Sequence, residues 1–186
     1  RVLEQVLPIP LVNNVLGSAG KKEVSGDIDV SVDPYLMPKD ELIEKLSNFI
    51  QERYKTDPRE SIKKSGISVH LKMPINGDPA NGFVQVDFMY HSGGPEEEKW
   101  MKFGMYSAGD ASKYSGADRN LLMSSIAKSQ GDLKYSWQKG LMNRSTEEIL
   151  STNPDVIASA LLGPGSTRQN LDSVESIMAT LKAKNP

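Results

Sequence analysis

A strict alternation of polar and apolar residues over positions 27–32 constrains the fold more than any other feature of this sequence. In a strand, successive side chains point to opposite faces. The apolar members of the segment therefore lie on one face, and Asp27 and Asp29 lie together on the other. This pattern predicts a half-buried strand in a sheet that keeps one polar face.

The residues that follow predict a helix and then two further strands. Pro38 precedes acidic residues and a run of apolar residues at helical spacing, which predicts an amphipathic helix of about 16 residues. Residues 67–71 and 83–89 alternate again, and the Pro-, Asn- and Gly-rich residues 74–82 separate them. We expect an antiparallel pair of strands joined by a long turn, with Asp87 on the polar side of the second strand.

Helical patterns replace strand patterns in the second half of the chain. The sequence thus predicts an α+β fold, in which a small mixed β-sheet core flanked by helices is followed by an all-helical C-terminal half. Residues 1–92 form the predicted core domain and residues 93–186 the helical region. The predicted helices of that region cover residues 118–130, begin at the Ser145 capping-box pattern, cover residues 154–162 and begin at Asp172.

Composition excludes several kinds of chemistry. The chain has no cysteine, which removes disulfides, thiolate metal sites and cysteine nucleophiles. Only His70 and His91 offer imidazole groups, and the net charge of −2 provides no global positive field for nucleic acid. No stretch approaches the roughly 20 apolar residues of a membrane span, and no signal pattern opens the chain. We expect a soluble, cytoplasmic protein with no membrane partner.

Three carboxylates are the best candidates for catalysis. Asp27 and Asp29 share a strand face at a separation of roughly 6 to 7 Å along the strand, and Asp87 lies on a strand that is able to pair beside it. Hard oxygen ligands favour Mg²⁺ or Mn²⁺. The small-residue turn at Gly17 and Ser18 offers backbone N–H groups and a hydroxyl to a triphosphate.

These residues resemble the signature of the polymerase-beta-like nucleotidyltransferase superfamily. The similarity rests on the Leu-Gly-Ser string at 16–18, the Asp-Ile-Asp-Val string at 27–30 and Asp87 within residues 84–88. Residues 84–89 and 112–120 also resemble phage-encoded members. The resemblance implies that Asp27, Asp29 and Asp87 bind the metal ions, that Asp87 helps to activate the attacking hydroxyl, and that Gly17 and Ser18 bind the triphosphate.

The resemblance predicts a metal-dependent nucleotidyltransferase that binds a nucleoside triphosphate, ATP among them, and uses Mg²⁺ or Mn²⁺. The acceptor hydroxyl belongs to an RNA end, a protein side chain or a small molecule. The spacer between Ser18 and Asp27 is shorter than the family pattern, which motivates an alternative from another class. In that alternative the fold is a catalytically silent binding or assembly module.

Further candidates flank these motifs. Lys113, Tyr114 and Arg119 surround a turn at the start of a predicted helix, where an anion is favoured, and we predict nucleotide contacts there. A solvated helix start is the other interpretation. Lys21 and Lys22 lie beside the Gly-Ser turn, where they either neutralise phosphate charge or are simply solvated. His70 either lies near the carboxylates or has a structural or surface role.

Overall fold

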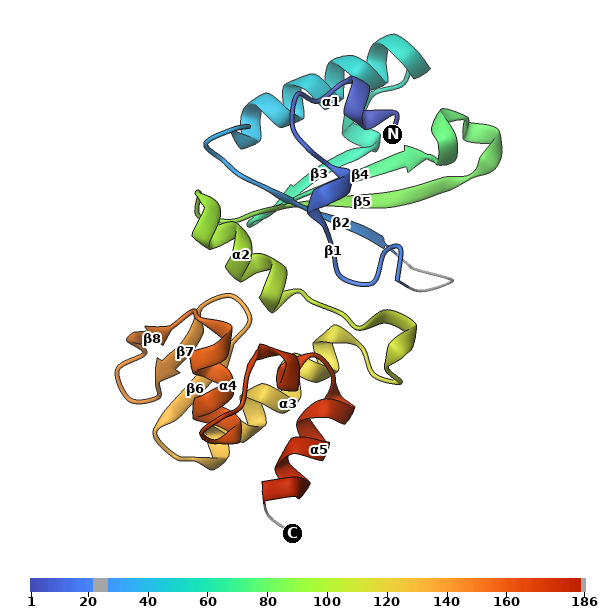
Figure 1. Cartoon of the computed structure of the whole chain (residues 1–186). Helices are drawn as coiled ribbons and strands as arrows, with labels where there is room; N and C mark the ends of the chain where they lie inside the picture. The colour runs from blue at the N-terminus through green and yellow to red at the C-terminus, as the bar shows by residue number, and fades with distance from the viewer. Residues whose placement is uncertain (22–26, 185–186) are drawn as a thin grey trace. The chain divides into compact units, whose positions relative to one another are not determined.

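The computed structural model describes residues 1–21 and 27–184, which divide into two compact units (Figure 1). Among the described residues, the first unit holds 1–20 and 27–99, and the second holds Lys21 and 100–184. Each unit has its own hydrophobic core. The chain thus buries its apolar side chains in two separate places.

A five-stranded mixed sheet forms the first unit within the described ranges. Its strand order is β1-β2-β5-β4-β3. Strands β2 and β5 are parallel, and the other neighbours are antiparallel. The strands are β1 (Val15–Leu16), β2 (Asp27–Val32), β3 (Ile62–Ser65), β4 (Ser68–Pro74) and β5 (Phe83–Tyr90), with 3₁₀ turns at Leu3–Gln5, Val12–Asn14, Pro58–Glu60, Ile75–Gly77 and Pro79–Asn81.

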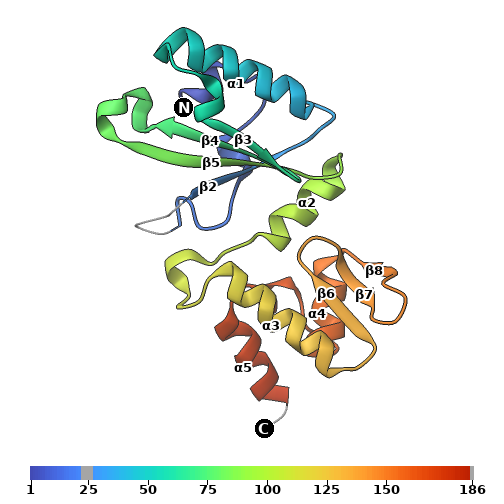
Figure 2. The ribbon, with the colours of Figure 1, turned by 180° about the vertical axis from the view of Figure 1, so that it is seen from behind.

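Helix α1 (Lys39–Tyr54) covers the apolar face of this sheet, as Figures 1 and 2 show. Its buried residues Leu42, Leu46 and Ile50 join Val30 and Phe88 from the strands in one core. The predicted helix after Pro38 and the predicted strands at 27–32, 67–71 and 83–89 are confirmed. The opposite face of the sheet carries the polar side chains, because strand residues alternate between faces.

The sequence reading missed strand β3. Its sequence, Ile-Lys-Lys-Ser, has two adjacent lysines in place of alternation, and only Ile62 is partly buried. The strand forms because it pairs with β4 at the edge of the sheet, where lysines are common and discourage pairing with another chain. A lone edge strand of this kind carries little periodic signal.

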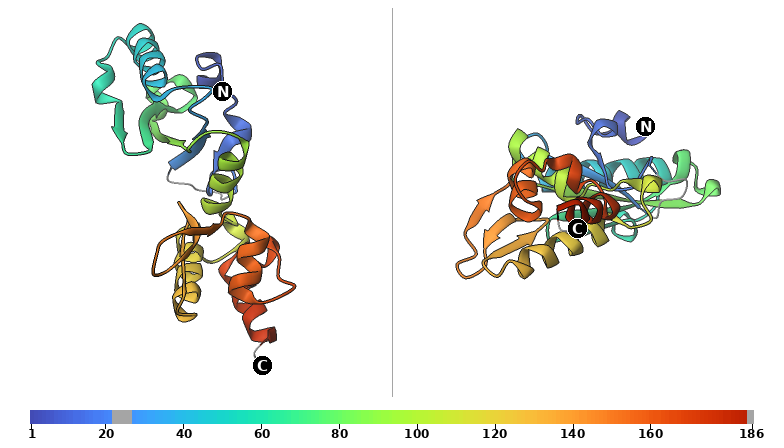
Figure 3. Two further views of the ribbon diagram at one scale, coloured as in Figure 1. Left: turned by 90° about the vertical axis from the view of Figure 1, so that its left-hand side faces the viewer. Right: turned by 60° about the horizontal axis from the view of Figure 1, so that its bottom comes forward.

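The second unit combines helices with a second sheet. In the described residues, β6 (Leu133–Ser136), β7 (Gly140–Asn143) and β8 (Ile149–Ser151) form a three-stranded antiparallel sheet. Helix α3 lies against β6 (Figure 3). Along the sequence, the boundary between the two units falls within helix α2 (Pro95–Gly104). The remaining helices are α3 (Gly116–Ser129), α4 (Pro154–Leu162) and α5 (Val174–Lys184), with 3₁₀ turns at Gly109–Ala111 and Arg168–Leu171.

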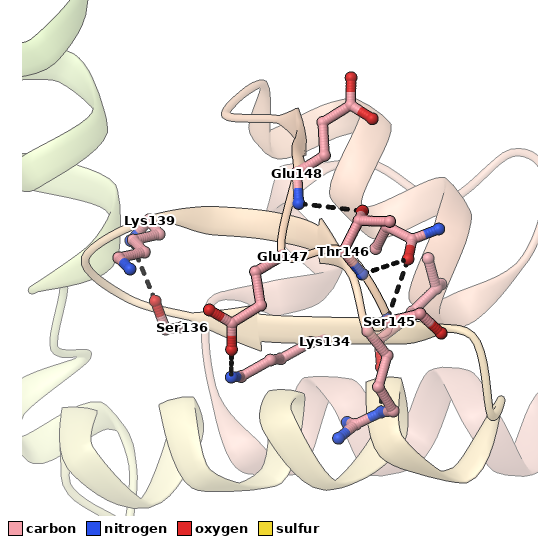
Figure 4. Close-up of polar contacts among 10 residues, drawn as sticks. Lys134, Ser136, Lys139, Ser145, Thr146, Glu147 and Glu148 are labelled. Atoms are coloured by element: carbon pink, nitrogen blue, oxygen red, sulfur yellow. Dashed lines mark hydrogen bonds and ion pairs between the residues drawn. The ribbon is translucent and has the colours of Figure 1, made fainter.

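The prediction of an all-helical C-terminal half is therefore wrong. The capping-box pattern at Ser145 does not begin a helix but belongs to the turn between β7 and β8 (Figure 4). The Asn143 side chain accepts hydrogen bonds from the backbone N–H groups of Ser145 and Thr146, at 2.9 and 3.0 Å. Glu147 then adopts a left-handed conformation with φ of 59°. An Asx turn followed by a left-handed residue reverses the chain instead of propagating a helix.

Substitution of Gly140 by alanine tests the pairing of β7 with β8 in the second sheet. Gly140 has φ of 90°, and a Cβ atom there would lie 2.6 Å from the Ser151 carbonyl oxygen of the neighbouring strand. Gly131 has φ of 86° with no atom within 4 Å of a Cβ. We expect Gly131→Ala to cost about 1 kcal/mol from backbone strain and Gly140→Ala about 1–3 kcal/mol more from the clash.

Urea unfolding followed by tryptophan fluorescence measures both variants. The protein's two tryptophans, Trp100 and Trp137, both belong to the second unit, so the signal reports that unit alone. Equal losses for the two variants would contradict the pairing of β7 with β8.

Candidate active site

Strand pairing brings three polar side chains into one row on the first sheet. Asp29 on β2 lies opposite Asp87 on β5, and Asp87 in turn lies opposite His70 on β4. Residues directly opposite each other on paired strands share a face. Asp29 of the Asp-Ile-Asp segment and Asp87 thus become neighbours, although they lie 58 positions apart in the sequence (87 − 29 = 58).

The solvent exposure of the three aspartates decreases from Asp27 through Asp29 to Asp87. Asp27 is exposed, Asp29 is half-buried and Asp87 is only 7% exposed. Two neighbours hold the buried Asp87 carboxylate at the same atom, Oδ1. The His70 Nδ1 atom lies 2.6 Å from it, and Gln85 Nε2 donates a hydrogen bond at 2.8 Å. Asp87 is therefore fixed in place by one residue from its own strand and one from the next.

The environment of Asp29 favours its protonated form. Burial raises the pKa of the Asp29 carboxyl to about 6, with further increases from its hydrogen bond to Asp87 and from the negative charges of Asp87 and Asp27. The charge of His70 acts in the opposite direction and lowers this pKa. Asp29 and Asp87 are thus a carboxyl pair whose like charges repel each other.

The turn at Gly17 lies against the Asp29 carboxyl group. Leu16 on β1 pairs with Asp29, and Gly17 follows directly with φ of 68°. A Cβ atom at Gly17 would lie 3.4 Å from Asp29 Oδ2. Glycine permits this left-handed turn beside the carboxylate. The structure therefore places Gly17 next to Asp29, and Ser18 follows Gly17 in the sequence.

The donor atoms of this site fit a hard divalent cation by their chemistry. Asp27, Asp29 and Asp87 supply carboxylate oxygens, which Mg²⁺ and Mn²⁺ prefer, and a dication relieves the repulsion within the Asp29–Asp87 pair. In the ranges 1–21 and 27–184, no three His, Asp or Glu side chains already stand arranged to hold a metal ion. The Asp87 carboxylate is directed at His70 and Gln85 instead.

The other predicted nucleotide-binding residues are Lys113, Tyr114 and Arg119. They belong to the second unit, whereas the three aspartates belong to the first. Arg119 is 2% exposed and donates hydrogen bonds to the carbonyl oxygens of Leu171 and Phe103, at 2.6 and 3.0 Å. It ties α3 to two other segments of that unit. Lys113 donates its backbone N–H to Glu175, and Tyr114 is 47% exposed.

Of the two lysines near the Gly-Ser turn, only Lys21 lies within the described residues. Lys21 belongs to the second unit, where its Nζ atom donates to the Ser107 carbonyl oxygen at 3.0 Å and lies 4.2 Å from the centre of the Tyr106 ring. Lys22 lies outside the described residues.

Gln85 is the site residue that the sequence analysis missed. It lies two positions before Asp87, so both side chains share a face of β5, and it donates to the Asp87 carboxylate. The i, i+2 spacing within an alternating strand was a signal for this contact. The sequence contains nothing that distinguishes Gln85 from other polar strand residues, however, until the order of the strands is known.

Comparisons with known proteins add no relative to this picture. No protein-family model, no curated protein and no solved structure matched the chain. In the described part of the chain, none of the helices combines the length and the apolar character that crossing a membrane requires. The chemistry of the site therefore rests on its own residues.

The Asp29 carboxyl gives a direct test of this arrangement. In metal-free protein with EDTA, we expect its ¹³C NMR signal to titrate with a midpoint of about 6, against an ordinary value of 3.8. The Asp87→Asn variant removes the neighbouring negative charge, so its Asp29 midpoint falls. A wild-type midpoint close to 4 would contradict the repelling pair.

The same shift sets the sign of a stability change. The folded state holds the Asp29 proton more tightly than the unfolded chain does. The stabilising contribution of that proton is complete below pH 3.8 and is lost as the pH rises through about 6. We expect Asp29→Asn to raise the thermal midpoint of the metal-free protein at pH 8 more than at pH 4, as measured by calorimetry. An equal change at both pH values would show that Asp29 carries no such shift.

Proposed function

We propose that this protein is a metal-dependent nucleotidyltransferase. It transfers a nucleoside monophosphate from a nucleoside triphosphate to an acceptor hydroxyl and releases pyrophosphate. The observation that carries this proposal is the register of β2 and β5, which sets Asp29 opposite Asp87 while the turn at Gly17 lies against Asp29. Three motifs that are separate in the sequence thus lie close together in the first unit, which supports the proposal.

Each motif has a part in the proposed reaction. Asp27, Asp29 and Asp87 are the residues that would hold Mg²⁺ or Mn²⁺. When bound, such an ion neutralises phosphate charge and aligns the attacking and leaving oxygens. The backbone N–H groups of the turn at Gly17 and Ser18 hold the triphosphate, since consecutive N–H groups in a turn form an anion-binding concavity.

Asp87 is the proposed acceptor of the hydroxyl proton. As the acceptor oxygen bonds to the α-phosphorus, the bond from that phosphorus to the bridging oxygen breaks, and pyrophosphate leaves with that electron pair. The proton of the hydroxyl passes to the Asp87 carboxylate. His70 and Gln85 act as positioning residues, because they fix the Asp87 carboxylate through Oδ1.

The proposal also covers the acceptor molecule, further nucleotide contacts and the cellular compartment. The net charge of −2 gives no field along which a long nucleic acid would bind, which favours a protein side chain or a small molecule over a long RNA track. The nucleotide contacts of Lys113, Tyr114 and Arg119 stay predictions. A supply of nucleoside triphosphates is consistent with a cytoplasmic location.

Isosteric variants of the carboxylates test the proposal. The protein is incubated with each α-³²P-labelled nucleoside triphosphate, Mg²⁺ or Mn²⁺, and a mixture of RNA, proteins and small molecules. We expect transfer of label by the wild type and a loss of at least about 100-fold in Asp29→Asn and in Asp87→Asn, because charge stabilisation of the transition state is lost.

The matched control is Asp40→Asn, which changes an exposed carboxylate on α1 and leaves the polar face of the sheet intact. Retained transfer in Asp29→Asn would overturn the proposal. Absence of transfer by the wild type, together with no Mg²⁺-dependent binding of a non-hydrolysable triphosphate in calorimetry, would favour the catalytically silent binding module instead.

A further inference from the structure

A cavity of about 380 Å³ opens on the polar face of the first sheet, beside the carboxylates. Its lining includes Lys63 from β3, Lys72 and His70 from β4, and Phe83 and Gln85 from β5. Cavities of this size accept small molecules. All of these residues belong to the first unit, so the cavity is complete within one compact body.

The cavity shares two of its lining residues with the carboxylate site. His70 and Gln85 both line it, and both contact Asp87 Oδ1. A molecule in the cavity therefore lies one side chain away from the buried carboxylate. Since Asp87 is the proposed acceptor of the hydroxyl proton, this neighbouring cavity is the candidate binding place for the molecule that receives the nucleotide.

The charge of the lining favours an anion. Lys63 and Lys72 present two ammonium groups, against one carboxylate from Glu60. Lys72 Nζ lies 4.5 Å from the centre of the Phe83 ring, a cation–π contact that holds the ammonium at the cavity. Among the described residues, none is hydrogen-bonded or ion-paired with the Lys63 ammonium. Both positive charges are available to a ligand.

We propose that this cavity binds the acceptor, and that the acceptor is a small phosphorylated molecule. Its phosphate pairs with the ammonium groups of Lys63 and Lys72, and its hydroxyl faces His70 and Gln85. The assignment as acceptor rests on the proposed nucleotidyltransferase function. The presence of a phosphate-binding cavity rests only on the lining and is testable by itself.

Ribose 5-phosphate is a suitable probe, because it carries a phosphate and free hydroxyls but no base or triphosphate. In ¹H–¹⁵N NMR with EDTA present, we expect it to bind with a dissociation constant of about 1 mM. The shifted amides should be those of β3, β4 and β5 around the cavity. The double variant Lys63→Gln, Lys72→Gln is expected to weaken binding about 10-fold.

Lys64→Gln is the matched control. Lys64 is the next residue along β3 and is also exposed, but it pairs with Val69 and so lies on the opposite face of the sheet. We expect it to bind the probe as the wild type does. No binding at about 10 mM probe, or equal weakening in Lys64→Gln, would overturn the phosphate site. Both changed lysines are exposed, and the NMR spectrum of each variant reports whether it folds.

A second measurement separates acceptor from donor. Mg²⁺-dependent binding of a non-hydrolysable triphosphate, measured by calorimetry, should persist in the double lysine variant and vanish in Asp29→Asn. Loss of triphosphate binding in the double variant would overturn the acceptor assignment and give the cavity to the donor nucleotide. Absence of triphosphate binding in the wild type, with the probe still bound at the lysines, would refute the proposed function and leave the phosphate cavity supported.

Discussion

The pairing of β2 with β5 is the interaction on which the candidate site depends. Because the two strands are parallel and in a fixed register, Asp29 lies opposite Asp87. A slip by one residue would turn one strand's side chains to the other face and separate the two carboxylates. Apolar packing prevents that slip, since Val30 and Phe88 on the same strands are buried under α1. The core beneath the sheet thus sets the geometry of the polar face above it.

The polar face gathers carboxyl groups at some cost to stability. A half-buried carboxyl beside two others holds a raised pKa, which means that its charged form is disfavoured in the folded protein. Sheet surfaces rarely gather like charges directly opposite each other, because the pair is destabilising. The contacts of His70 and Gln85 with Asp87 offset part of this cost. A group of carboxylates that a fold tolerates in this way is a candidate for chemistry.

Local patterns predicted those elements whose burial is periodic. The alternation over residues 27–32 and 83–89 and the helical spacing after Pro38 gave β2, β5 and α1, and hence the shared face of the aspartates. The contact of His70 with Asp87 depends on strand order, which no local pattern encodes. In the second half, the Ser145 pattern is compatible with a helix start and with a turn, and the Asn143 side chain decides in favour of the turn. The short strand β3 depends on its pairing with β4, and the turn after β7 depends on a local Asn143 side-chain contact, which the Ser145 pattern does not distinguish from a helix start.

Charge changes sign across the polar face, from the aspartates on β2 to the lysines on β3 and β4. Asp87 lies between the two groups, and the residues that hold it, His70 and Gln85, also line the cavity. Under the proposed function, a ligand that contacts either of them would reach the Asp87 carboxylate through a single hydrogen bond. We therefore expect binding in the cavity to affect the carboxylate site through two side chains on adjacent strands, without movement of the sheet itself.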